Sequence, residues 1–264
     1  MGSRSAHLNR VSLLSAHGFS PLSNFGMAVK LFMISFSPGA WHSAKHAGRV
    51  FRKYALWMGV YSFALVGLAA MSIGCALTLE SVTELKSFQA EKLSGAMISL
   101  GLMREMGPLT VSLAWCVRVS SLISEEAKYF RADFDSDKSF AQNYILPRYG
   151  TTMLMATCMG AYGLLIGFAT AVLVSPFFGV TNMLDFLDSA HDAIKFKDIV
   201  VYFIKLSVVN PTIGFFMGVT AGLNAYRTGS QPAPEAITMT FLYGYLANLM
   251  VTIAAFYKGE SLLG

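Results

Sequence analysis

Four charged side chains lie inside apolar stretches, and they are the residues best suited to chemistry. Arg104 and Glu105 are adjacent within residues 102–109, Arg118 follows fourteen residues after Arg104, and Lys205 lies in a later apolar run. Placing a charge at the centre of a membrane costs about 2.5–3.5 kcal/mol, so such residues usually face a bundle interior or a wet cavity. The pattern therefore indicates polar contacts in a substrate cavity, with Arg104 and Glu105 as the first candidates and Lys205 as the next.

Each of these charges also has a structural interpretation, and the residues alone leave both open. Arg104 and Glu105 could clamp neighbouring helices together. Arg118 returns to within about 40° of the helix face of Arg104, but its place nearer the end of the run favours snorkelling to the interface. Lys205 could snorkel in the same way. Arg118 is therefore the last of the four cavity candidates.

The chain carries none of the common motifs for catalysis, ATP binding or metal binding. It contains no GxxxxGK[ST], HExxH or GxSxG sequence, which excludes a P-loop, a zincin site and a nucleophile elbow. Cys75, Cys116 and Cys158 lie in apolar runs, with no CxxC pair and no histidine at ligand spacing. We expect no catalytic residue, no metal and no cofactor in this chain, and an energy source in another chain or an ion gradient.

The composition is that of a membrane protein. The 264 residues are 54% hydrophobic and only 13% charged, whereas about a quarter of the residues in soluble domains are charged. An ordinary soluble globule is excluded, and the apolar content excludes disorder. A helix crosses a bilayer with about 20 mainly apolar residues. We predict an all-α integral membrane domain over residues 1–264 with five transmembrane helices, at about 54–79, 96–123, 149–174, 199–226 and 236–257.

The distribution of Lys and Arg sets the orientation of these spans. With a cytoplasmic N-terminus, the segments on the cytoplasmic side hold twelve basic residues and those on the other side hold five. Because basic residues concentrate on the cytoplasmic side, we expect the N-terminus inside and the C-terminus outside. The net charge of +5 is then explained by topology and anionic lipid, and no nucleic-acid partner is expected.

Residues 1–53 form a cytoplasmic or interfacial segment before the first span. No signal peptide is visible, and residues 27–36 follow the spacing of a short amphipathic helix. A second helix with one basic face is expected over residues 42–53, lying on the cytoplasmic lipid surface; a solvated helix packed on the protein is the alternative. The basic face consists of His42, Lys45, His46, Arg49, Arg52 and Lys53.

Glycine and proline mark packing and kinks within the spans. Gly107 permits a close backbone approach, and Pro108 removes a backbone hydrogen bond beside the Arg–Glu pair. Pro211 predicts a kink in the fourth span. Small residues that recur every four positions let membrane helices approach closely, and we favour packing within the chain over dimerisation. These residues are Gly214, Gly218 and Gly222.

Residues 124–138, after the second span, are mixed in charge and numerous enough for a short surface helix. On the cytoplasmic side this segment could dock a soluble partner. A solvated run of charges is the alternative.

Taken together, these residues resemble the MlaE (YrbE) family, the permeases of ABC transporters that work with MCE proteins in bacterial lipid trafficking. The family stretch L-x-R-E-x-G-P matches residues 102–108, and a small-residue segment that follows it matches residues 117–121. A Pro-Arg pair opens the third span at residues 147–148. The resemblance covers nearly the whole chain. Further matches are an acidic residue at Glu126, a lysine at Lys205, and threonines at Thr238 and Thr240.

The chain also departs from the family pattern. Val117 stands where a glycine is usual, and Thr252 stands near the place of a frequent acidic residue. The cytoplasmic segment is shorter and lacks the family's Glu-Gln pair, which normally meets the ATPase. These differences indicate a divergent branch.

The resemblance implies a homodimer of permeases in the bacterial inner membrane, with a periplasmic C-terminus and a phospholipid or related lipid bound in a cavity between the two copies. A dimer of cytoplasmic ABC ATPases would bind ATP, and a ring of MCE-domain proteins would lie on the periplasmic face, so this chain would not itself be an enzyme. The residues implied for ATPase coupling are Glu125, Glu126, Lys128, Arg131 and Asp133.

Two other functions remain open. An ATP-independent carrier or channel is disfavoured because no inverted repeat is detectable. A structural subunit of a membrane complex is disfavoured by the Arg–Glu pair within a span.

Overall fold

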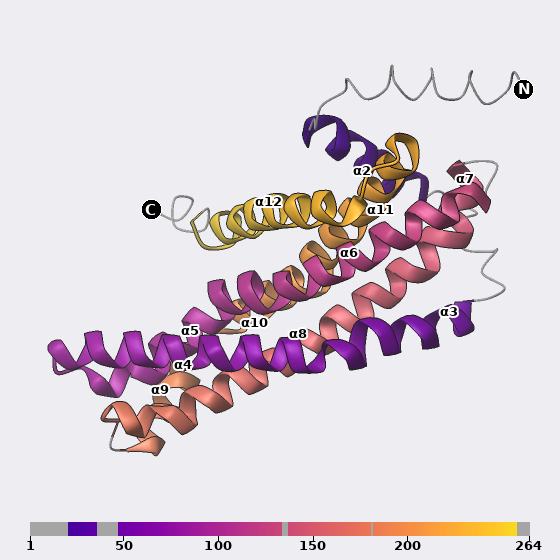
Figure 1. Ribbon diagram of the computed structural model, residues 1–264. Helices are drawn as coiled ribbons and strands as arrows, with labels where there is room; N and C mark the ends of the chain where they lie inside the picture. The colour runs from indigo at the N-terminus through magenta and orange to yellow at the C-terminus, as the bar shows by residue number, and fades with distance from the viewer. Residues whose placement is uncertain (1–20, 36–46, 134–136, 181, 258–264) are drawn as a thin grey trace, which may run out of the picture.

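The computed structural model describes residues 21–35, 47–133, 137–180 and 182–257, and within these ranges the chain is helical and contains no strand. Figure 1 shows an elongated bundle with α4 along one side and α12 along the other. The all-α prediction is confirmed, and so is the prediction of five helices that could cross a membrane. The helical segments long and apolar enough to cross a membrane are Val50–Ser87, Glu91–Asp133, Ala141–Phe178, Phe196–Thr228 and Pro232–Phe256.

Most of these spans are not uniform α-helices, because short π-helical stretches interrupt them. The first span consists of α3 (Ala47–Tyr54) and α4 (Phe63–Ser87), joined by a π segment and a 3-10 turn. The second consists of α5 (Ser94–Gly101), the π segment Leu102–Ser112 and α6 (Leu113–Phe130). The π segments widen the turns around the residues that the sequence singles out.

The remaining spans follow the same plan. The 3-10 turn Arg131–Asp133 and α7 (Asp137–Phe140) lead to the third span, which is the π segment Ala141–Ile145 followed by α8 (Leu146–Val174). The helix α9 (Met183–Ala193) connects the third span to the fourth. The fourth comprises α10 (Phe196–Ile204), the π segment Lys205–Val209 and α11 (Asn210–Thr228), and the fifth comprises α12 (Pro232–Thr252) and the π segment Ile253–Tyr257.

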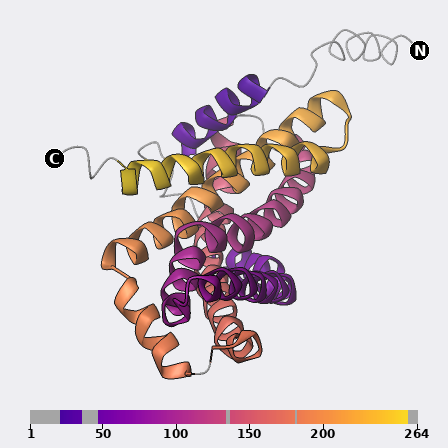
Figure 2. The ribbon, with the colours of Figure 1, turned by 90° about the vertical axis from the view of Figure 1, so that its left-hand side faces the viewer.

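The kink predicted at Pro211 coincides with the π segment Lys205–Val209, which ends directly before Asn210. Figure 2 shows the chain changing direction between α10 and α11. Proline at the second position of α11 needs no backbone donor, since the first turn of a helix has no partner for it. The fourth span is thus two helices joined by a wide turn.

The glycine repeat packs α11 against α6, as the sequence analysis favoured. A Cβ atom added to Gly214 would lie 2.9 Å from Cβ of Cys116, and one added to Gly218 would lie 3.0 Å from Cα of Ser120. An added Cβ on Gly222 would lie 2.8 Å from Cβ of Ala127. Close approach along this seam therefore depends on glycine at all three positions, and the repeat serves packing within the chain.

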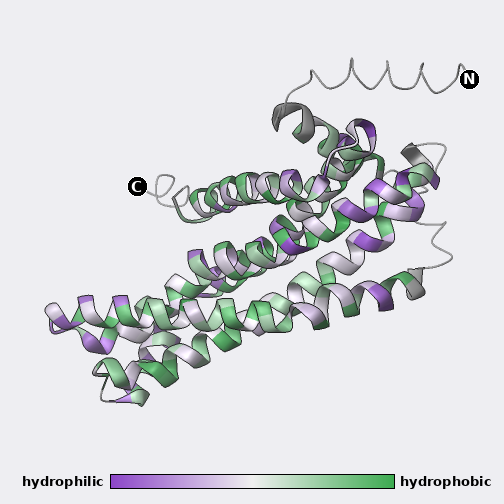
Figure 3. Ribbon diagram, in the orientation of Figure 1, coloured by the Kyte–Doolittle hydropathy of each residue, from purple (hydrophilic) through white to green (hydrophobic). Residues whose placement is uncertain are grey.

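The outer faces of the spans are apolar. Large side chains such as Leu68, Leu165 and Met250 are 65–70% exposed. Figure 3 shows hydrophilic residues concentrated towards the two ends of the bundle. Exposed hydrophobic residues around the middle of a bundle with polar ends are the surface expected to face lipid.

The first described helix, α2 (Pro21–Ser35), begins six residues before the predicted 27–36 helix. Ala28 and Leu31 are buried, and Phe32 packs against Phe216 of α11 with ring centroids 5.3 Å apart. Met33 on the same helix is 70% exposed.

The basic helix predicted for residues 42–53 is described only from Ala47, where α3 begins and continues into the first span. Arg52 and Lys53 are exposed. His42, Lys45 and His46 lie outside the described residues.

Candidate functional site

Lys205 occupies the centre of a polar cluster between the second, fourth and fifth spans. Its side chain is completely buried, and Nζ donates to the carbonyl oxygen of Arg104 at 2.5 Å and to Oγ1 of Thr252 at 2.6 Å. No carboxylate of the described residues lies within 4.0 Å of Nζ. We call Arg104, Asp198, Lys205 and Thr252 the Lys205 cluster.

Gly107 and Pro108 shape the backbone that follows the carbonyl bound by Lys205. Pro108 has no N–H to donate, so one carbonyl of the preceding turn loses a backbone partner. Gly107 is required in the same turn, since an added Cβ would lie against the carbonyl oxygen of Leu102 and 3.2 Å from the ring of Tyr202. Gly107 and Pro108 both lie in the π segment that contains Arg104 and Glu105.

Arg104 forms an ion pair that the sequence did not predict. Its Nε lies 2.7 Å from Oδ1 of Asp198, which is 1% exposed, while Oδ2 of Asp198 accepts from the backbone N–H of Lys195 at 3.0 Å. The guanidinium also lies over the ring of Phe256, 4.5 Å from its centroid. Arg104 therefore joins the second span to the start of the fourth, although 36% of its side chain stays exposed.

Glu105 takes no part in this ion pair. It is partly exposed and close enough to Lys205 to interact with it electrostatically. Arg104 thus links two helices, as its structural interpretation supposed, but the acidic residue that pairs with it is Asp198 and not Glu105.

Two buried amide side chains, Asn210 and Asn248, form further hydrogen bonds between the spans that the Lys205 cluster joins. Asn210 donates to the carbonyl oxygen of Pro108 and to Oγ of Ser112, both at 3.0 Å. Asn248 of α12 donates to Oδ1 of Asn210 at 2.5 Å. All three spans are therefore joined by buried hydrogen bonds at two successive levels.

Arg118 is not part of the Lys205 cluster. Its Nη1 donates to the carbonyl oxygen of Tyr61 at 2.7 Å, and Nε1 of Trp115 donates to that of Met58 at the same distance. Both carbonyls belong to the interruption between α3 and α4, residues 55–62, where the regular α-helical pattern is lost. Arg118 thus binds the first span rather than snorkelling free of the protein.

A second charged cluster lies near the other end of the bundle, around Arg148. Its Nε lies 3.2 Å from Oε2 of Glu126 and donates to the hydroxyl of Tyr54 at 2.8 Å, and Tyr54 also donates to Glu126. The guanidinium stacks on Tyr144, 4.0 Å from the ring centroid. We call Tyr54, Glu126, Tyr144 and Arg148 the Arg148 cluster.

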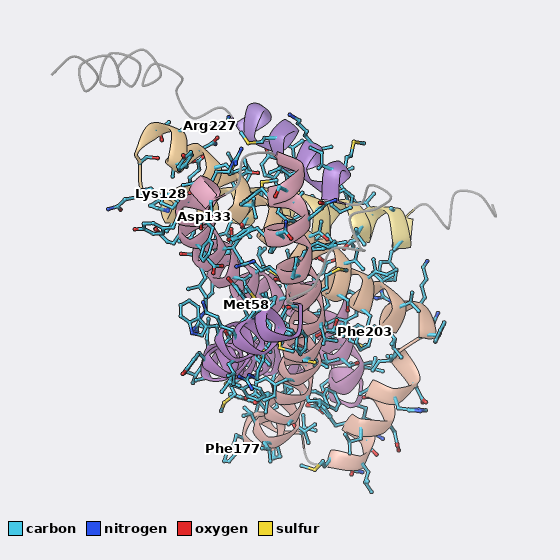
Figure 4. All side chains as sticks on the ribbon, turned by 90° about the vertical axis from the view of Figure 1, so that its right-hand side faces the viewer. Met58, Lys128, Asp133, Phe177, Phe203 and Arg227 are labelled. Carbon is cyan, nitrogen blue, oxygen red and sulfur yellow. The ribbon has the colours of Figure 1, made fainter. Side chains whose placement is uncertain are left out.

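The residues predicted to couple to an ATPase surround the end of α6. Glu126 faces inward in the Arg148 cluster, whereas Lys128 donates to the carbonyl oxygen of Ser230 at 2.7 Å. Arg131 lies over the ring of Phe140, and Asp133 is exposed. Figure 4 shows Lys128 and Asp133 at the same end of the molecule as Arg227. Glu125 is partly exposed on the last turns of α6.

Among the described residues, no group of three or more His, Cys, Asp or Glu side chains is arranged to hold a metal ion. Cys116 is buried, and Cys75 and Cys158 are exposed.

Sequence reasoning missed Asp198 and the roles of Arg148, Asn210 and Asn248. Asp198 has the signal of an acidic residue three positions after a helix start, which is typical of a capping residue. Asp198 also lies near the predicted outer end of the fourth span, and Arg104 lies near the same side of the membrane in the second span. The amides carry no comparable signal, because only the packing of α11 on α12 brings them together.

Comparisons with known proteins extend over most of the chain. The family model for Permease MlaE matches residues 51–256. A probable ABC transporter permease protein of Rickettsia bellii is 24% identical over 212 residues, which are 76% of this chain and 80% of that protein. A protein of the same description from Synechocystis is 23% identical over 231 residues, 82% of this chain and 88% of that one. The intermembrane phospholipid transport system permease protein MlaE of Haemophilus influenzae is 32% identical over 75 residues, 28% of this chain and 29% of that protein.

Proposed function

The chain belongs to the MlaE permease family, and from this premise we propose that it moves phospholipid or a related lipid between the bacterial inner membrane and a periplasmic MCE protein. It is a multi-pass membrane protein of the kind that serves as the permease of an ABC transporter. The match of the family model to residues 51–256 carries the proposal.

In the proposed transporter, ATP is hydrolysed by a separate ATPase on the cytoplasmic side. The absence of a P-loop in this sequence supports that division of labour. The surface around the end of α6, which includes the partly exposed Lys128 and the exposed Asp133, is the proposed ATPase contact. The N-terminus is then cytoplasmic and the C-terminus periplasmic, in line with the twelve-to-five distribution of basic residues.

The proposed lipid cavity lies between two copies of the permease and is bordered by the Lys205 cluster. Arg104 keeps 36% of its side chain exposed and Glu105 is partly exposed, so polar groups on this part of the second span can meet a headgroup. Phospholipid as substrate is also supported by the similarity to the Haemophilus relative, which is described as an intermembrane phospholipid transport system permease protein.

The π segments supply the proposed movement. The π segments Leu102–Ser112 and Lys205–Val209 contact each other, and Phe256 of a third, Ile253–Tyr257, lies against Arg104. Such π turns frequently mark functional sites in helices. In this mechanism, closure of the ATPases shifts α10 relative to α11, and the hydrogen bonds of Lys205 transmit the shift to the second and fifth spans.

The test combines co-purification with lipid crosslinking. The permease is isolated from its native membrane, any associated ATPase is identified, and a photocrosslinker at the exposed Met106 reports lipid. Lys205→Gln is expected to abolish most ATP-dependent lipid transfer, whereas Lys92→Gln, an exposed lysine elsewhere in the chain, is the matched control. Transport by the isolated chain without an ATPase would instead establish a carrier.

A structural subunit is the second candidate, because Arg104 is engaged with Asp198 as a helix clamp. Assembly of a complex without lipid crosslinking or transfer would favour it.

A further inference from the structure

A pocket of about 530 Å³ lies under α2 and is bordered by the ends of α6 and α11. The pocket includes none of the residues of the Lys205 cluster. Three basic residues, Lys30, Arg131 and Arg227, line it, and none of the described residues in the lining is acidic. Figure 4 shows Arg227 beside α2 at this end of the molecule. The remaining lining residues are Gly26, Met27, Leu31, Ala132, Leu223 and Tyr226.

The residues that line the pocket suit a ligand in which an anionic group is attached to an apolar group. Guanidinium and ammonium groups bind phosphate oxygens through charge-assisted hydrogen bonds. Met27, Leu31 and Leu223 supply apolar surface to the same pocket. Asp133, which follows the lining residue Ala132, is exposed and lies outside the lining.

The position of the pocket indicates where the anion comes from. The flanking helix α2 buries Ala28 and Leu31 against the bundle but exposes Val29 and Met33, which are 38% and 70% exposed. A helix with apolar groups on its free side is suited to the boundary between headgroups and acyl chains. A basic pocket next to such a helix is then at the depth of lipid phosphates, and basic pockets between spans on the cytoplasmic side bind anionic headgroups.

The size of the pocket favours a headgroup over a segment of protein. Pockets for small molecules typically measure about 300–1,000 Å³, and about 530 Å³ lies within that range. A docked ATPase would instead need an interface of many side chains.

We propose that this pocket binds the phosphate headgroup of an anionic phospholipid of the cytoplasmic leaflet, and so fixes α2 to the ends of α6 and α11. The proposal rests on the orientation given under the proposed function. It is separate from the transported lipid, because the pocket shares no residue with the Lys205 cluster. Bound lipid would stabilise the position of α2 beside the proposed ATPase contact.

The test measures lipid retained by the purified full-length chain in a neutral detergent, by native mass spectrometry. Phosphatidylglycerol and phosphatidylcholine are added in separate arms, and inorganic phosphate is added as a competitor in a third. The triple variant Lys30→Gln, Arg131→Gln, Arg227→Gln is compared with Lys86→Gln, Lys92→Gln, Lys197→Gln, which removes equal charge from exposed lysines outside the lining. A charge-preserving variant, Lys30→Arg, Arg131→Lys, Arg227→Lys, checks folding.

The pocket variant is expected to lose at least about tenfold of its phosphatidylglycerol binding, because each basic residue near an anionic surface contributes about a fivefold preference. The control and charge-preserving variants should stay near wild type, and phosphatidylcholine retention should not change.

Equal loss in the pocket and control variants, or none in the pocket variant, would overturn the proposal. Full displacement of lipid by inorganic phosphate would identify a soluble-anion site instead. Unchanged lipid binding together with loss of a co-purifying ATPase would assign the pocket to that interface. These outcomes are independent of the proposed function, which fails only if wild type shows neither an ATPase partner nor lipid transfer.

Discussion

The Lys205 cluster and the Arg148 cluster solve the same problem, a buried cation in a membrane bundle, in opposite ways. Arg148 has the carboxylate of Glu126 at 3.2 Å, the hydroxyl of Tyr54 at 2.8 Å and an aromatic ring beneath it. Among the described residues, Lys205 has only a backbone carbonyl and the hydroxyl of Thr252 as hydrogen-bond acceptors. A buried charge is costly unless it is paired and hydrogen-bonded, so the two sites differ in how firmly they are held.

The backbone around the Arg148 cluster is also more regular than the backbone around the Lys205 cluster. Arg148 lies in the first turns of α8 and binds the α-helical parts of the first and second spans. Lys205 begins one π segment and bonds to a second. We infer that the Arg148 cluster fixes three spans at one end, whereas the Lys205 cluster joins spans whose relative position can change.

The largest loss of stability is expected from Arg148→Met. It leaves the carboxylate of Glu126, whose side chain is only 18% exposed, without its partner, and breaking a buried pair in this way costs about 3–5 kcal/mol. The measurement is the midpoint of thermal unfolding in detergent. The double variant Glu126→Gln, Arg148→Met should recover part of the lost stability. An unchanged midpoint in Arg148→Met alone would show that the Arg148 cluster is not the more firmly held of the two.

Lys205→Met should cost less stability but more activity. Removing the ammonium leaves a carbonyl and a hydroxyl without their donor, at about 1–3 kcal/mol, and also removes an unpaired buried charge. Unfolding and ATP-dependent lipid transfer are measured on the same preparation. A variant as unstable as Arg148→Met, or one with normal transfer, would contradict the assignment of movement to the Lys205 cluster.

Thr252 offers a smaller and sharper change at the same site. Thr252→Val removes one acceptor of Lys205 and should destabilise the protein by about 1 kcal/mol. Thr252→Asp should be more stable than Thr252→Val, because it gives Lys205 a carboxylate as Glu126 does for Arg148. Equal unfolding midpoints for the two variants would show that the contact to residue 252 contributes little.

The smallest effect is expected from Asp198→Asn. The ion pair with Arg104 becomes a hydrogen bond from the charged guanidinium to a neutral amide oxygen. Since 36% of the Arg104 side chain is exposed, loss of the ion pair should cost no more than about 1 kcal/mol. Crosslinking of lipid at Met106 should increase as the guanidinium is released. A decrease in crosslinking would indicate that Asp198 orients Arg104 for the substrate.

Much of the architecture follows from patterns that are local in the sequence. Five apolar runs predicted the spans, and glycine at every fourth position predicted the close packing of α11, because a bare helix face is visible without knowledge of its partner. The predicted kink near Pro211 also depends on one residue and its neighbours.

The partners of the charged residues could not be predicted in this way. Asp198 is 94 positions from Arg104, and Arg148 is 22 from Glu126, so these pairs exist only once the spans are packed. The π segments were also missed, since their wide turns are stabilised by side chains from other spans. The periodicity of a sequence indicates which face of a helix is buried, but it does not indicate which polar atom of another span contacts that face.

The interruption between α3 and α4 bears on how the chain enters the bilayer. The carbonyl oxygens of Met58 and Tyr61 accept from Trp115 and Arg118 of α6, which the ribosome synthesises later. Hydrocarbon offers no donor to a backbone carbonyl, so the first span alone would carry this weak point unsupported. The first and second spans are therefore expected to leave the insertion machinery as a hairpin, with the earlier helix completed by the later one.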